Sequence, residues 1–156
     1  MAATNSLLSA IAAASLLVAC SSDPEPSAST AGAGSGIRPG SQEDLVANVG
    51  DRVLFDTDRS SVRGDQRPIL ERQARWMGQF PQVQVMLEGH ADERGTREYN
   101  LALAQRRANS ARDVLVASGV AGTRIQTISY GKDRPEGLGS NEQAWAQNRR
   151  AVTLVR

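Results

Sequence analysis

The chain has 156 residues, of which 40% are hydrophobic and 22% charged, and its formal net charge is +1. This length suffices for one domain with a core, and the near-neutral charge leaves no broad cationic face, so nucleic acid is not expected as a partner. One cysteine, Cys20, and one histidine, His90, exclude an internal disulfide and a zinc cluster, and no cofactor is expected.

The N-terminus predicts an export signal. The apolar run from Ser6 to Ala19 is too short to span a bilayer as a helix but suits the core of a signal peptide. It ends in Leu-Val-Ala-Cys, which resembles a lipobox, so residues 1–19 are predicted as a lipoprotein signal peptide. Cys20 is then expected to carry S-diacylglycerol and an N-palmitoyl group. An ordinary secretory signal with an incidental cysteine is the alternative, and residues 1–19 contain no Lys or Arg.

Residues 20–45 are predicted to form a lipidated cysteine followed by a flexible tether. Ser, Ala, Gly and Pro dominate this segment, and without apolar periodicity it does not offset the entropy of folding. Such a tether spans roughly 28 Å on average, enough to present a domain to a separate layer. The folded domain is expected at 46–156.

The domain is predicted to alternate strands and helices. Proline marks the first turn of a helix at Pro68 and stops it at Pro81, and Thr96 can cap a long helix that Gly119 ends. The order predicts an α+β fold, with helices on a small mixed four-stranded sheet. The expected strands are 49–55, 82–87, 125–130 and 151–155, and the expected helices are 68–80, 96–119 and 141–149.

The long helix carries two rows of side chains at helical spacing. A stripe of small and apolar residues is expected to face the sheet, and a second row borders it, so its polar and cationic members need not point into water. The stripe comprises Leu101, Ala104, Ala108, Ala111 and Leu115, and the second row comprises Asn100, Leu103 and Arg107.

Five ordered motifs carry a family resemblance. They are FDTD (55–58), GHADERG (89–95), TREYNLALAQRRA (96–108), SYG (129–131) and NRRAV (148–152). Together they resemble the OmpA-like peptidoglycan-binding family, most closely its peptidoglycan-associated lipoproteins, over roughly residues 50–155.

The resemblance implies a binding protein rather than an enzyme. The expected ligand is the diaminopimelate of the peptidoglycan stem peptide, whose free end carries an ammonium and a carboxylate on one carbon. Arg107 is expected to meet the carboxylate and Asp92 the ammonium, because charge-assisted hydrogen bonds are the strong ones. By resemblance, the same pocket is lined by Asp58, Arg94, Thr96, Tyr99, Asn100 and Leu103.

The resemblance also implies partners and a location. TolB and TolA are the expected protein partners, in the Tol-Pal system that draws the outer membrane inward at cell division. Ser21 after the cysteine, in place of the aspartate of an inner-membrane retention signal, favours anchoring in the outer membrane with the domain in the periplasm. A protein-interaction module with wall binding secondary is a compatible reading.

Other roles for the same residues stay open. An envelope hydrolase could use Glu88, Asp92 and Glu93 as acid and base, although no nucleophile or metal ligand accompanies them. Asp92 could fix a turn, and Arg107 could be a solvated helix arginine. If both instead bind the ligand, replacement of either by alanine is expected to abolish retention by diaminopimelate sacculi and to leave the thermal transition nearly unchanged.

Two further groups of side chains are read as structural. Arg149 and Arg150 are expected only to favour a helix C-terminus, where the dipole stabilises cations. His90 is interpreted as a structural hydrogen-bonder, because no second histidine, cysteine or catalytic serine accompanies it.

Overall fold

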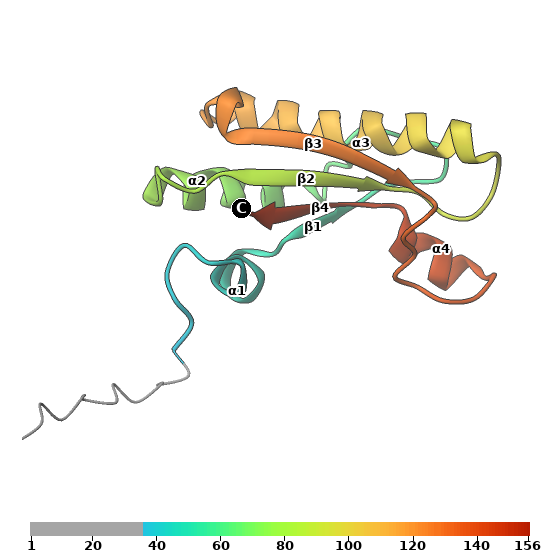
Figure 1. The fold of residues 1–156 in the computed structure, drawn as a ribbon, viewed down its shortest axis with the longest axis horizontal. Coiled ribbons are helices and arrows are strands. Elements are labelled where there is room, and N and C mark those ends of the chain that lie inside the picture. Colours follow the sequence, from blue (N-terminus) through green and yellow to red (C-terminus); the bar gives the residue numbers. More distant parts are fainter. Residues whose placement is uncertain (1–35) are drawn as a thin grey trace, which may run out of the picture. The chain divides into compact units, whose positions relative to one another are not determined.

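The computed structural model describes residues 36–156 of the chain (Figure 1). The expected signal peptide, Cys20 and the first part of the expected tether lie outside these residues. Within the described part, no helix is long and apolar enough to cross a membrane.

Four strands form one mixed sheet in the order β1-β4-β2-β3 (Figure 1). Strand β4 runs antiparallel to both β1 and β2, whereas β2 and β3 are parallel. The predicted α+β fold with a small mixed sheet is therefore confirmed. The strands are β1 (Arg52–Leu54), β2 (Val85–His90), β3 (Ile125–Gly131) and β4 (Arg150–Val155).

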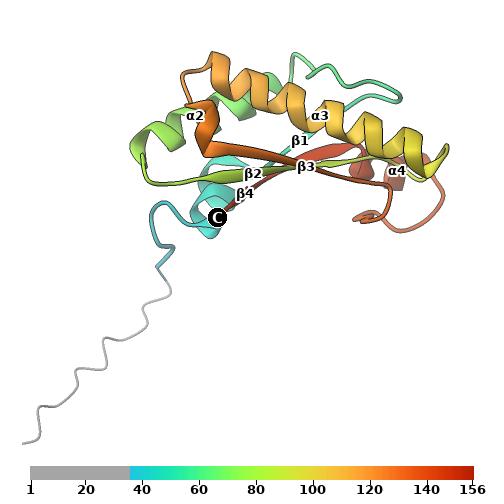
Figure 2. The same ribbon diagram turned by 45° about the horizontal axis from the view of Figure 1, so that its top comes forward.

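Two long helices cover one face of this sheet (Figure 2). Helix α2 (Arg67–Gln79) begins with proline in its first turn, and α3 (Arg97–Ala117) is capped by the Thr96 hydroxyl, which accepts from the backbone N–H of Tyr99. A 3₁₀ turn (Gly122–Arg124) leads from α3 into β3, and the short helix α4 (Glu142–Asn148) precedes β4.

Small residues let α3 approach the sheet closely. Ala104, Ala108, Ala111 and Leu115 are fully buried, as the stripe predicts, whereas Leu101 is only partly buried. At the closest point, a Cβ on Gly89 of β2 would lie 1.9 Å from the Ala104 carbonyl oxygen. Glycine is therefore the residue that permits this contact.

The folded part begins earlier than the expected boundary at residue 46. Helix α1 (Gln42–Asp44) continues into a π-helical turn (Leu45–Val49), and Leu45 is fully buried in the core. The Gln42 side chain accepts from the Val155 N–H and donates to the Thr153 carbonyl, so it continues the edge of β4 that β1 leaves unpaired. Specific bonds of this kind fold a segment whose composition alone suggests a tether.

The first strand is shorter than expected for the same reason. Residues up to Val49 are helical, and Gly50 turns the chain with a φ of 96° before β1 begins at Arg52. The left-handed region of this turn favours glycine.

His90 is buried on the sheet face opposite α3, and its surroundings disfavour the charged imidazole. Neither ring nitrogen has a hydrogen-bond partner among the described residues, contrary to the structural hydrogen bond expected, and the nearest carboxylate oxygen, of Glu88, lies 3.6 Å from Nε2. Burial, together with the cations Arg150 and Arg134, lowers the pKa of His90 to about 4. The imidazole is therefore neutral at neutral pH.

This pKa predicts an acid-sensitive contribution to folding stability. Between pH 6.5 and 4 the unfolded chain binds the His90 proton and the folded chain does not, so the free energy of unfolding falls as the pH decreases through this window. Over the whole window, the free energy of unfolding is expected to decrease by about 3 kcal/mol because of His90. Chemical denaturation of wild type and His90→Asn at several pH values should show a difference that shrinks below pH 6.5. Parallel pH curves for the two proteins would contradict the prediction.

Candidate functional site

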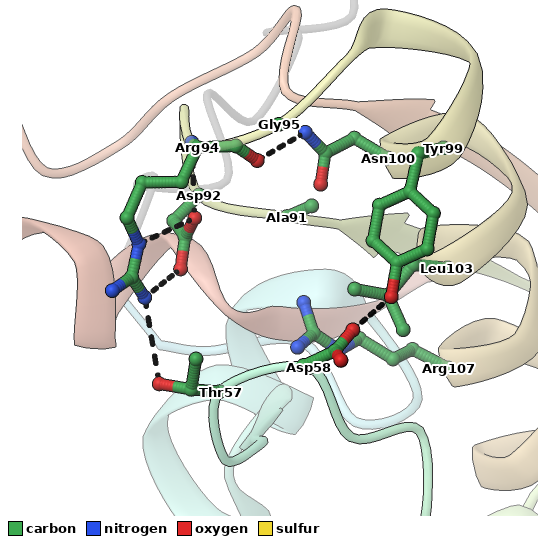
Figure 3. Close-up of a pocket in the computed structure, with 10 residues that line it drawn as sticks. All are labelled: Thr57, Asp58, Ala91, Asp92, Arg94, Gly95, Tyr99, Asn100, Leu103 and Arg107. Carbon is green, nitrogen blue, oxygen red and sulfur yellow. Dashed lines mark hydrogen bonds and ion pairs between the residues drawn. The ribbon is translucent and has the colours of Figure 1, made fainter.

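A cavity of about 320 Å³ opens where the loop after β2 meets the first turns of α3 and the β1–α2 loop (Figure 3). Seven of the eight residues expected at a binding site line it. These are Asp58, Asp92, Arg94, Tyr99, Asn100, Leu103 and Arg107. Thr96, the eighth, does not line the cavity and instead caps α3.

Three lining residues escaped the sequence analysis: Thr57, Ala91 and Gly95. Each neighbours an expected residue in the chain and lies within the FDTD or GHADERG motif, so the motifs contained the signal for them. Gly95 has a φ of 89°, which side-chain-bearing residues rarely adopt, so it shapes the loop as well as the cavity wall.

The loop after β2 is held from both sides. On one side, the Asn100 amide donates to the Arg94 carbonyl at 2.8 Å. On the other, the Lys132 ammonium donates to the carbonyls of Glu93 and Gly95, at 3.1 and 2.7 Å. Because its backbone acceptors are bonded, the loop presents its side chains to the cavity in a fixed arrangement.

Arg107 places a buried cation at the cavity. Its side chain is fully buried, and its guanidinium donates to the carbonyls of Arg59, His90 and Asp56 at 2.8, 2.9 and 3.0 Å. No carboxylate of the described residues pairs with it directly. Two of the five guanidinium N–H groups remain for another acceptor.

The charge of Arg107 survives this burial. Burial lowers the pKa of Arg107 to about 10, while the nearby carboxylates of Asp92 and Asp58 oppose that shift. The guanidinium is thus protonated at neutral pH. A buried cation bonded only to neutral oxygens favours an anionic ligand.

Asp92 is ionised and already bonded. Burial disfavours its charged form, but hydrogen bonds from Arg94 and Arg149 outweigh burial and hold the pKa of the Asp92 carboxyl below its usual value. Arg94 contributes its backbone N–H and Nε to Oδ1, at 3.1 and 3.2 Å, and Nη2 to Oδ2 at 2.7 Å. This grip fixes the carboxylate at the cavity wall (Figure 3).

Asp58 and Tyr99 are bonded to each other at the cavity. The Tyr99 hydroxyl donates to Asp58 Oδ1, which joins the β1–α2 loop to α3 (Figure 3). This bond raises the pKa of Tyr99. Asp58 is the only described residue other than glycine with a positive φ, at 56°. Strain of this kind is often found at binding sites.

Arg149 reaches the site, although it was expected only to favour a helix end. Its side chain is buried, and its Nη1 lies 3.5 Å from Asp92 Oδ2. Adjacent residues of a strand point to opposite faces, so one member of an Arg-Arg pair beside a strand must point toward the helices. That alternation was the missed signal.

The carboxylates of the alternative hydrolase reading do not converge. Glu88 is absent from the cavity lining and lies near His90, with its carboxylate 3.6 Å from Nε2, and Glu93 accepts from the Trp145 indole at 3.0 Å. Only Asp92 of the three lines the cavity. Among residues 36–156, no group of three His, Cys, Asp or Glu could hold a metal ion. The arrangement suits binding of a small group that carries opposite charges.

Fold and cavity together define a small α+β domain with a cavity lined by charged side chains. The model of the OmpA family matches residues 54–149, so the chain belongs to the OmpA family. Its relatives place it among the peptidoglycan-associated lipoproteins of that family. The peptidoglycan-associated lipoprotein of Rhizobium meliloti is 48% identical over 98% of this chain and 89% of the relative. That of Agrobacterium fabrum is 54% identical over 80% of this chain and 70% of the relative.

Solved structures share the fold. The crystal structure of the peptidoglycan-associated lipoprotein from Burkholderia pseudomallei matches with a TM-score of 0.68 and 37% identity, over 72% of this chain and all of that one. The C-terminal domain of Helicobacter pylori MotB matches with a TM-score of 0.64 over 68% of this chain and 84% of that one. Its 22% identity supports the shared fold alone.

Proposed function

We propose that this chain is an outer-membrane lipoprotein that binds peptidoglycan non-covalently, through diaminopimelate, and so links the outer membrane to the cell wall. The names of its relatives support association with peptidoglycan. One observation supports the choice of ligand: Arg107 is a buried cation with free donors at a cavity that two carboxylates also line.

The end group of diaminopimelate fits these charges. Its carboxylate would accept from the free N–H groups of Arg107, and its ammonium would donate to Asp92, with Asp58 as a second carboxylate nearby. Each partner would then meet an opposite charge away from bulk water, where charge-assisted hydrogen bonds are strongest. Tyr99, Asn100 and Leu103 would enclose the aliphatic part of the ligand.

The remainder of the proposal concerns the cell envelope. Cys20, diacylated on sulfur and left as the mature N-terminus by removal of the signal peptide, would hold the chain in the outer membrane. The segment that follows it would let the domain reach the wall. TolB and TolA are the proposed protein partners, in the Tol-Pal system that supports envelope integrity and outer-membrane constriction at division. If the protein binds sacculi but does not bind TolB, it would instead be a wall anchor outside the Tol-Pal system.

Sacculi of different composition test whether the protein recognises the carboxylate of diaminopimelate. A lysine wall offers an ammonium at the same position but no carboxylate for Arg107, so sacculi with lysine should retain the protein at least ~30-fold less than sacculi with diaminopimelate. Sacculi whose diaminopimelate is amidated serve as the matched control, because only the carboxylate charge is lost. Equal retention by all three walls in a pull-down would refute recognition of the carboxylate.

A further inference from the structure

Asp92 has two arginine partners that differ in their access to solvent. The Arg94 side chain is 39% exposed, whereas that of Arg149 is 8% exposed. Together they place four donors on the carboxylate: three from Arg94 and one from Arg149. A carboxylate has about four lone-pair sites, so a further donor must displace one of these.

Arg94 is the partner that can leave. Its guanidinium stacks on the Trp145 ring at 4.3 Å and donates weakly to the Thr57 hydroxyl at 3.4 Å, and both contacts are near solvent. Water can therefore replace Asp92 as its partner at little cost. Arg149 has no such exchange open to it, because it is buried.

Two further parts of the fold fix Arg149. Its Nε donates to the Phe55 carbonyl at the end of β1, and its Nη2 donates to Glu142 of α4, at 3.2 and 2.7 Å. The Phe55 N–H donates in return to the Arg149 carbonyl at 2.8 Å. Phe55 precedes the loop that carries Asp58, so a single side chain joins the two carboxylate-bearing walls of the cavity.

We propose that Arg149 is a positioning residue, which keeps Asp92 oriented and ionised while Arg94 gives way to the ligand's ammonium. This inference rests on the proposed function. Without Arg149, Asp92 would have no cationic hydrogen-bond partner within the protein once Arg94 moved aside. Until the ligand's ammonium was in place, a buried carboxylate without such a partner would tend to take up a proton. Arg149 thus acts through Asp92 and does not line the cavity itself.

The test compares Arg149→Gln with Arg150→Gln in the full-length protein. Arg150 is the matched control, because it is equally buried and adjacent in the chain but pairs with Glu136. Carboxyl ¹³C NMR follows the titration of Asp92, and pull-downs at several pH values follow retention by diaminopimelate sacculi.

Arg149→Gln should raise the pKa of Asp92, move the acid limit of binding to higher pH and weaken retention about tenfold at neutral pH, through loss of a charged hydrogen bond. Arg150→Gln should change none of these. An Asp92 titration and pH profile that match wild type in Arg149→Gln would overturn the inference. Wild-type protein that is not retained at all would instead refute the proposed function.

A second measurement needs no variant. On addition of a muropeptide that ends in diaminopimelate, the Arg149 Nε–H resonance should stay protected from solvent exchange, while that of Arg94 should change. Exchange that becomes fast at Arg149, or an unchanged Arg94, would overturn the assignment of roles.

Discussion

Replacement of Arg107 with alanine should abolish retention by diaminopimelate sacculi, with a loss of at least ~30-fold. The reason is that the only fully buried cation at the cavity disappears, so the ligand carboxylate loses the one cationic partner that is shielded from water. Arg106→Ala is the matched control, because Arg106 is exposed on the same helix and absent from the cavity lining. A pull-down in which both variants bind like wild type would contradict the account.

The same substitution should also destabilise the fold, unlike the nearly unchanged thermal transition expected from sequence. Three backbone carbonyls lose their donor, and two of them, of Asp56 and Arg59, belong to the β1–α2 loop. Unsatisfied buried acceptors and the lost packing on Phe55 should lower the free energy of unfolding by about 3 kcal/mol. Arg107→Lys, which keeps the charge but loses the planar fork, separates binding from folding, and chemical denaturation measures the stability.

Asp92→Asn should likewise remove retention by sacculi, although the shape of the side chain is kept. The amide cannot compensate an ammonium, and its NH₂ group would face the guanidinium donors of Arg94 and Arg149. The buried guanidinium of Arg149 then keeps Glu142 as its one carboxylate partner, so we also expect a loss of about 2 kcal/mol in the free energy of unfolding.

Asp133→Asn provides the comparison for this substitution. Asp133 also accepts from an arginine, Arg97, but at the surface, where such a pair contributes little. Its removal should change neither retention nor the denaturation midpoint appreciably. Retention of Asp92→Asn at the wild-type level would show that this carboxylate does not meet the ligand.

The helices, whose residues follow a regular spacing, could be predicted from the sequence. Proline and threonine mark the starts of α2 and α3, and the spacing along α3 indicates the buried stripe and the second row beside it. The structure goes further than that row suggested, because Asn100, Leu103 and Arg107 are buried rather than at the border of the core. Seven expected residues meet at one cavity, while their part in binding remains a prediction.

The features that the sequence did not predict depend on contacts between segments that are distant in the chain. Nothing in the local pattern shows that Gln42 bonds to the backbone of β4 or that Arg149, rather than Arg150, turns toward Asp92. The same holds for Arg107, whose partners are the carbonyls of Asp56, Arg59 and His90. The first two are oriented by a loop that includes the left-handed Asp58. Composition therefore placed the start of the domain too late. Arg149 does cap the C-terminus of α4, as its position in the sequence indicates, but its contact with Asp92 was not predicted.

The pairing of Arg107 with a ligand carboxylate can be observed in an NMR titration of isotope-labelled protein with a muropeptide that ends in diaminopimelate. Saturable changes should appear in the guanidinium resonances of Arg107 and the carboxyl resonance of Asp92, and the same muropeptide with that carboxylate amidated should produce much weaker ones. Saturable binding that leaves the resonances of both side chains unperturbed would contradict the proposal that this cavity binds peptidoglycan.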